Sequence, residues 1–182
     1  MPFSTSALFR ATALAVVITG AAVALPGCAV SVPQGVQPVS GFDASKYMGT
    51  WYELARIDHR FEKGLTQVSA TYSLNADGSV TVLNRGYDPA KQAWREAQGK
   101  ARFLRQADEA ALKVSFFGPF YGGYNVVSLD AQYQTALVIG SSLDYMWILS
   151  RSKTIPEAQR QALLQKAQAL GVDLGQVMRV DQ

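Results

Sequence analysis

The chain has 182 residues, of which 48% are hydrophobic, and a formal net charge of +3. This length suffices for one domain with a core but not for two of ordinary size. The basic residues form no cluster or stripe, which argues against a nucleic-acid partner, and the single cysteine excludes an internal disulfide.

The first 27 residues predict a lipoprotein signal peptide. Residues 1–10 carry one charge, Arg10, and residues 11–25 form an uncharged apolar run. That run is shorter than the roughly 20 residues that span a bilayer, and it ends in small residues, as signal peptides do. Without Arg10 the net charge falls from +3 to +2.

The apolar run ends in Leu-Pro-Gly directly before Cys28, a sequence that resembles the lipobox of bacterial lipoproteins. The resemblance implies cleavage before Cys28 and acylation of this residue, and several acyl chains anchor a protein stably. The alternative is a buried core cysteine. Ala29, rather than an aspartate, follows Cys28; by resemblance to enterobacterial sorting rules, this implies the outer membrane, with the chain facing the periplasm.

Residues 28–40 predict an acylated N-terminus and a flexible linker. The segment contains prolines, a glycine, valines and small polar residues, and it has no charge. A dozen extended residues would hold a domain about 30 to 40 Å from the bilayer. We therefore expect a single folded domain over residues 41–182.

The folded part predicts eight short strands joined mostly by tight turns. In residues 67–74 apolar and polar side chains alternate, and the following Asn-Ala-Asp-Gly is a strong turn signal. Neighbouring strands at this spacing predict an all-β, antiparallel up-and-down barrel or a sandwich. The predicted strands span residues 49–56, 67–74, 80–87, 93–104, 111–116, 121–129, 135–141 and 145–150.

An amphipathic helix follows the eighth strand. Thr154 is a candidate N-cap, Pro156 falls in the first turn, and Gly171 ends the helix. The helix needs an apolar surface, and the outside of the barrel is the only one available. Residues 176–180 predict a short final strand. The apolar face of the helix consists of Leu163, Leu164, Ala167 and Leu170.

Three short motifs lie in order along these elements. Gly49 and Trp51 lie on the first strand, Asp130 and Tyr133 in a late turn, and Arg151 directly after the last strand. Their order and spacing resemble the lipocalin family over residues 41–182. The similarity is greatest to bacterial outer-membrane lipocalins.

The resemblance implies an eight-stranded antiparallel up-and-down β-barrel with a C-terminal α-helix packed outside. A barrel of this size is just wide enough to hold one small ligand. In the family the Trp51 and Arg151 pair closes the base, with the guanidinium over the indole in a cation–π contact of about 0.5–2 kcal/mol. Gly49 allows close packing beside the indole.

Ligand contacts are expected from inward-facing residues nearer the open end. Alternation also places Ala70, Ala101 and Leu112 inside, and the small residues Ala97 and Gly99 are expected to leave space. The alternative is that about half of these residues only pack the lower barrel. The expected ligand-binding residues are Tyr72, Val82, Phe103, Val114, Phe116, Tyr145 and Trp147.

Two segments leave several interpretations open. Residues 116–124 are rich in aromatic residues and glycine, and they can line the pocket mouth, form a homodimer interface or meet a membrane surface. His59 lies between Asp58 and Arg60 in the first long loop. A catalytic relay is one interpretation, a solvated loop histidine is the favoured one, and His59, Arg60 or Lys63 can also meet an anionic head group.

The sequence predicts a binding protein rather than an enzyme. It has no Gly-x-Ser-x-Gly motif, no second histidine and no cysteine after Cys28, so no catalytic residue, metal or cofactor is expected. The expected ligand is an amphipathic lipid, either a fatty acid or a lysophospholipid, stored or transported in the cell envelope. The alternatives are a lipocalin-fold enzyme, for which two titratable groups should converge inside the barrel, and an envelope scaffold.

Overall fold

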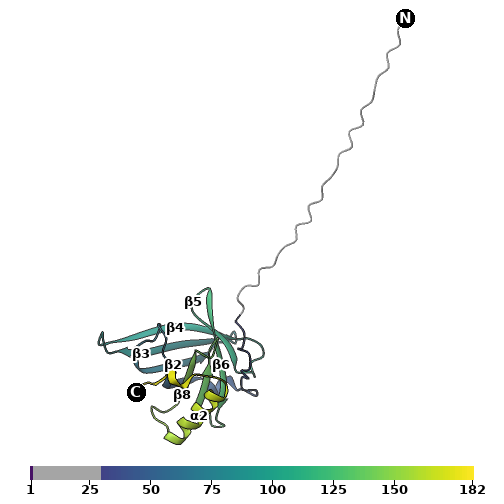
Figure 1. Ribbon diagram of the computed structural model, residues 1–182. Coiled ribbons are helices and arrows are strands. Elements are labelled where there is room, and N and C mark those ends of the chain that lie inside the picture. Colours follow the sequence, from purple (N-terminus) through teal and green to yellow (C-terminus); the bar gives the residue numbers. More distant parts are fainter. Residues whose placement is uncertain (2–29) are drawn as a thin grey trace.

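The computed structural model describes Met1 and residues 30–182 (Figure 1). The predicted signal peptide, Cys28 and Ala29 lie outside the described residues. No helix in the described part of the chain is long and apolar enough to cross a membrane.

Eight consecutive strands form one closed antiparallel barrel, as predicted, and a ninth strand is added to it. Each of the strands β1 to β8 pairs with the next one in the sequence, and β1 also pairs with β8, which closes the sheet. The strands are β1 (Gly49–Ile57), β2 (Thr66–Leu74), β3 (Val80–Asp88), β4 (Ala93–Phe103), β5 (Ala111–Phe117), β6 (Phe120–Leu129), β7 (Thr135–Ile139), β8 (Met146–Ser150) and β9 (Val177–Arg179).

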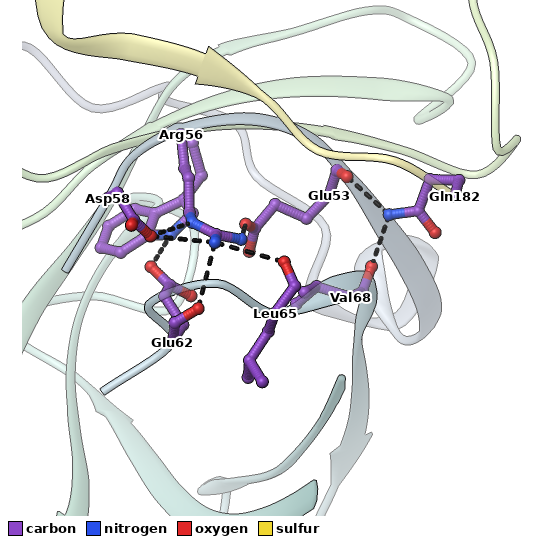
Figure 2. Close-up of polar contacts among 8 residues, drawn as sticks. Glu53, Arg56, Asp58, Glu62, Leu65, Val68 and Gln182 are labelled. Atoms are coloured by element: carbon purple, nitrogen blue, oxygen red, sulfur yellow. Dashed lines mark hydrogen bonds and ion pairs between the residues drawn. The ribbon is translucent and has the colours of Figure 1, made fainter. Parts of the chain in front are cut away.

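Strand β9 fills a gap between β1 and β2. These two strands pair only over the first residues of β1, Gly49 to Tyr52. Farther along β1, β9 takes the place of β2. The side-chain amide of Gln182 then donates hydrogen bonds to the backbone oxygens of Glu53 and Val68, at 2.6 and 2.9 Å (Figure 2). The end of the chain therefore completes the barrel wall where two strands separate.

Helix α2 (Glu157–Ala169) packs on the outside of the barrel, as the sequence predicts. Leu163 and Ala167 are buried against outward-facing strand residues such as Leu137 and Ile148. The predicted N-cap is wrong. The helix begins after Pro156, and no side chain caps it, because Thr154 lies too far before the first turn.

Two short helices were not predicted. They are α1 (Ala44–Tyr47), whose first turn is capped by the Asp43 carboxylate, and η1 (Leu174–Gln176). Four residues or fewer are too short to show a helical period. Helix α1 matters for the fold because it carries Tyr47, which is buried against Trp51 with the ring centroids 4.6 Å apart.

Residues 30–40 differ from the free linker that the sequence predicts, because they lie against the barrel. Val36 is buried, and its side chain joins the apolar cluster under α2. The N–H of Val39 donates to the Val126 oxygen at 2.8 Å, and the Val39 oxygen accepts from the N–H of Ala110 at 2.9 Å. The valines find apolar surface on the barrel, and composition alone does not reveal such a surface.

The base of the barrel is closed around Trp51, which is fully buried. The Arg151 guanidinium lies 4.1 Å from the centre of the indole ring. Its nitrogens also donate to backbone oxygens of residues 46–48, Thr50 and Tyr133, at 2.7 to 3.3 Å. One side chain thus joins α1, the start of β1 and the turn between β6 and β7.

The turn between β6 and β7 is held by Asp130. Its carboxylate accepts hydrogen bonds from the backbone N–H groups of Gln132, Gln134 and Thr135. Tyr133 has a positive φ of 57°, and its hydroxyl accepts from the N–H of Asp43 at 2.9 Å. Gly49, with a φ of +94°, lies where an added Cβ would be 3.3 Å from the Arg151 guanidinium. These residues position the base rather than the opposite end.

We expect Trp51→Ala to lower the free energy of unfolding by about 3–5 kcal/mol, because it removes a fully buried aromatic side chain and leaves a cavity beneath Arg151. Urea denaturation followed by circular dichroism measures this loss. Trp94→Ala is the matched control, because Trp94 is 45% exposed. A loss at Trp94 as large as that at Trp51 would contradict this account of the base.

Candidate functional site: the barrel interior and its mouth

The mouth of the barrel is formed by the four connections opposite the base. They join β1 to β2 (residues 58–65), β3 to β4 (89–92), β5 to β6 (118–119) and β7 to β8 (140–145). In an up-and-down barrel alternate connections lie at the same end. The first of these connections is the longest, and it carries His59 and Glu62.

The interior is apolar at the base and partly open to solvent above it. Trp51, Val126 and Val138 are fully buried, and Tyr72 and Val82 are nearly so. Above this floor, Val114, Phe116 and Trp147 are only partly buried although they pack against the interior cluster, and Tyr145 is partly buried at the mouth. Phe103, also a predicted ligand-binding residue, lies instead at the base, where its ring centroid is 6.3 Å from that of Phe42.

Three tyrosine hydroxyls meet inside the lower barrel. Tyr72 donates to the Tyr124 hydroxyl at 2.9 Å, and the Tyr47 and Tyr124 hydroxyls are 2.7 Å apart. Burial raises the pKa of all three phenols, so they stay neutral. Polar atoms at this depth satisfy one another, which lets tyrosines serve as core residues.

A buried cluster of charges lies between this floor and the mouth (Figure 2). Arg56, fully buried, donates to the Glu53 carboxylate and to Asp58, each at 2.9 Å. It also donates to the backbone oxygens of Glu62 and Leu65 at 3.0 and 3.3 Å. Arg56 therefore ties the long β1–β2 connection to the inner wall of the barrel.

Glu62 joins the connection to the opposite wall. Its carboxylate accepts a hydrogen bond from the Trp147 indole N–H at 3.0 Å. The cluster thus contains three carboxylates, of Glu53, Asp58 and Glu62, and one guanidinium. Burial raises the pKa of Glu62 to about 7, against the opposing effects of Trp147 and Arg56. Burial and the charge of Glu62 raise the pKa of Glu53 to about 8.

This cluster was not predicted, because the side chains expected inside the barrel were apolar or aromatic. Glu53 lies two residues after Trp51, so alternation along the strand already placed it inside. Arg56 would point outward by the same rule, but a register shift between Glu53 and Ala55 turns it inward. The bulge has no signal in the sequence.

His59 closes one side of the mouth. Its Nε2 lies 2.8 Å from the backbone oxygen of Asp144, and its ring stacks on Tyr145 with centroids 3.9 Å apart. The contact joins the first and last connections of the mouth. Arg60 and Lys63 are exposed beside it. No group of three or more potential metal ligands occurs in residues 30–182.

The expected space beside Gly99 is occupied. An added Cβ there would lie 2.8 Å from the Phe116 ring, so the glycine admits this aromatic side chain rather than leaving room for a ligand. The β4–β5 pairing ends nearby, at Lys100 and Ser115. Beyond that point Ala97 is exposed on a hairpin that projects from the barrel (Figure 1).

The aromatic segment between β5 and β6 is exposed at the mouth. Phe117 and Phe120 are 77% and 78% exposed, and Tyr121 lies against Lys113, whose Nζ is 5.1 Å from the ring centre. These rings point away from the interior cluster, so they rim the mouth without filling the barrel.

Comparison with protein families matches residues 42–182 to the lipocalin-like domain. The chain belongs to the lipocalin family. It is 53% identical over 150 residues to the outer membrane lipoprotein Blc of Escherichia coli K12, covering 82% of this chain and 85% of that protein. It is 49% identical over 165 residues to the protein of the same name in Citrobacter freundii, covering 91% and 93%.

More distant relatives share the fold. The temperature-induced lipocalin-1 of Arabidopsis thaliana is 36% identical over 155 residues, 81% of this chain and 83% of that protein. Insecticyanin from the tobacco hornworm Manduca sexta is only 19% identical, yet its structure superposes with a TM-score of 0.65 over 81% of this chain and 84% of its own. The lipocalin barrel is therefore kept at low sequence identity.

The charge cluster predicts a stability that falls as pH rises. Glu53 and Glu62 hold protons in the folded chain up to about pH 8 and 7, whereas in the unfolded chain they lose them near pH 4.5. Folding therefore takes up protons in this window, and the stability present below pH 4.5 is lost as pH rises toward 8.

We expect Glu62→Gln to flatten this dependence, removing about 1–3 kcal/mol of the change between pH 5 and 8. Urea denaturation at several pH values measures it. Gln keeps an acceptor for Trp147 but cannot ionise. Glu96→Gln, on an exposed strand position, is the control and should leave the slope unchanged. An equal slope in wild type and Glu62→Gln would contradict the raised pKa.

Proposed function

We propose that this lipocalin binds amphipathic lipids, fatty acids or lysophospholipids, and stores or transports them in the cell envelope while anchored to the outer membrane through acylated Cys28. Two relatives at about 50% identity are named outer membrane lipoproteins, which supports the location. The leader before Cys28 supports the anchor.

The observation that carries the proposal is the partly open apolar interior above a sealed floor. Side chains that pack against the inner cluster, among them Val114, Phe116 and Trp147, remain reachable by solvent. When a lipid tail occupies this space, the apolar surface of the tail and that of these side chains are both removed from water. Each buried methylene contributes about 0.8 kcal/mol, so eight contribute about 6 kcal/mol before the cost of association.

The polar end of the lipid stays at the mouth. The Arg56 guanidinium already donates to Glu53, to Asp58 and to two backbone oxygens, which disfavours binding of an anionic head group at this depth. Arg60 and Lys63 lie exposed on the β1–β2 connection and offer a favourable place for a carboxylate or phosphate. The lipid therefore enters tail first.

A lipocalin-fold enzyme is the second candidate, because titratable groups do converge inside the barrel. Glu53 and Glu62 both have raised pKa values near neutral pH, as general acids and bases often do. Arg56 and Trp147 already occupy these carboxylates, which favours a structural role. If the wild type converts a bound lipid into another product and the Glu62→Gln variant does not, the protein is an enzyme.

Native mass spectrometry of the protein purified from envelopes, followed by lipid extraction, tests the proposal. We expect bound lipid, and we expect lysophospholipids to displace a fluorescent fatty acid. Recovery of no lipid together with no displacement would overturn the proposal.

We expect Trp147→Ala to weaken binding of the fluorescent fatty acid about tenfold or more, since it removes a large apolar surface worth about 1.5 kcal/mol or more. Trp94→Ala is the control, because Trp94 lies on the projecting hairpin. A thermal melt of each variant separates lost binding from lost folding. Unchanged affinity in a folded Trp147→Ala protein would exclude the part of the barrel interior around Trp147 as the binding surface.

A further inference from the structure

The outer surface of strands β4 and β5 carries three neighbouring cations. Ala101 is buried in the interior cluster, so Lys100 and Arg102 on either side of it point outward. Arg102 lies directly opposite Lys113 on β5, and residues opposite each other in a ladder share a face. The three positive charges therefore gather on one part of the barrel wall.

The positive charge on this part of the wall is only partly neutralised. The Asp77 carboxylate, in the β2–β3 turn, lies 3.1 Å from the Lys100 Nζ and 3.4 Å from a nitrogen of Arg102. Farther along the same surface Arg85 and Glu96 form an ion pair at 3.4 Å. Together with Lys113, these side chains are four basic and two acidic groups, so the surface keeps a net charge of +2.

Lys100 and Arg102 also line a hollow of about 540 Å³. Small-molecule sites commonly have volumes of roughly 300–1,000 Å³. Cations next to hydroxyl and amide groups are suited to a phosphate, because all of these groups can donate hydrogen bonds to its oxygens. The neutral polar side chains that line the same hollow are those of Asn75, Thr81, Gln98 and Ser115.

The tip of the β5–β6 hairpin places exposed aromatic rings beside the cations. Phe117 and Phe120 pair across the hairpin and are 77% and 78% exposed. Tyr121 follows them and lines the hollow, and the Lys113 Nζ lies 5.1 Å from the centre of its ring. Neighbouring exposed apolar side chains on a folded domain mark an interaction surface.

We propose that this surface, called here the docking face, binds an anionic phospholipid bilayer. The docking face consists of Lys100, Arg102, Lys113, Phe117 and Phe120. The two phenylalanine rings enter the bilayer interface, the three cations lie against lipid phosphates, and one phosphate occupies the hollow. The inference goes beyond the proposed function, because docking requires no lipid inside the barrel and failure of the proposed function leaves it intact.

The combination of rings and cations favours a bilayer over other partners. Aromatic side chains gain free energy at a membrane interface, and each Lys or Arg near an anionic surface is attracted to it. A purely apolar partner would remove the three cations from water without compensation. An acidic protein or a soluble anion would satisfy the cations but leave Phe117 and Phe120 exposed to water.

Cosedimentation with vesicles tests the docking face. The mature chain, residues 28–182, carries Cys28→Ser, so that acyl chains do not mask the contribution of the face. The closed barrel and its core lie within residues 30–182, so this chain contains the folded domain. It is mixed with sucrose-loaded vesicles of phosphatidylcholine alone, or of phosphatidylcholine and phosphatidylglycerol.

We expect binding to the vesicles with phosphatidylglycerol to be about tenfold stronger or more, and to weaken as salt is added. Equal binding to both kinds of vesicle, or binding to neither, would overturn the proposal.

The contribution of the rings is measured with the double variant Phe117→Ser and Phe120→Ser. It should lower binding to the anionic vesicles about tenfold or more, because two apolar side chains no longer leave water. Leu74→Ser with Met178→Ser is the matched control, since these side chains are 46% and 38% exposed elsewhere on the barrel. Thermal melts verify that each protein is folded, and wild-type binding by the folded Phe117→Ser and Phe120→Ser chain would overturn the proposal.

The contribution of the cations is measured with Arg102→Gln and Lys113→Gln together. We expect binding to the anionic vesicles to fall about fivefold or more. Arg105→Gln with Lys153→Gln removes the same charge from two exposed positions at the base and should change binding much less. Equal losses in the two double variants would show attraction to the whole positive chain rather than to the docking face, and would overturn the proposal.

Sedimentation velocity separates a bilayer from a second copy of this chain as the partner of the rings. We expect the wild type and the Phe117→Ser and Phe120→Ser chain to have the same mass in solution. A change from dimer to monomer in that variant would assign the rings to a contact between copies, and the docking face would not be a membrane surface.

Discussion

The closure of the base around Trp51 is the constraint on which the rest of the barrel depends. The guanidinium of Arg151 covers the indole and donates hydrogen bonds to carbonyl oxygens of α1, β1 and the β6–β7 turn. A closed end fixes the eight strands relative to one another at one level. The opposite end is then free to open, since its strands need not all pair to the tip.

In the upper barrel, strands β1 and β2 separate, and β9 together with Gln182 fills the gap between them. The same region holds Arg56, which secures the β1–β2 connection through the backbone of Glu62 and Leu65. A buried charge cluster costs desolvation free energy and contributes little net stability. The cluster places polar side chains between the apolar lower barrel and the solvent. This arrangement suits a ligand with one apolar and one polar end.

The two ends of the barrel therefore have separate tasks. The base carries α1, the contacts of residues 39 and 40 with the barrel, and the Trp51–Arg151 contact that stabilises the fold. The mouth carries the exposed aromatic rim at Phe117 and Phe120 and the histidine that joins two connections.

The strand count, the order of the elements and the outer position of the helix followed from the sequence, because period-two alternation and turn residues are local signals. So did Trp51 and Arg151, whose spacing is a family pattern. The Arg56 cluster did not, because a bulge after Glu53 reversed one side chain. The space predicted beside Gly99 was also wrong, because the ring of Phe116 on the neighbouring strand occupies it. Residues 30–40 had the composition of a free linker, since their valines are buried only by a surface that distant strands build. The sequence by itself determined the order of the barrel strands and the outer helix; contacts between elements far apart in the chain decided what lies inside the barrel and where residues 30–40 pack.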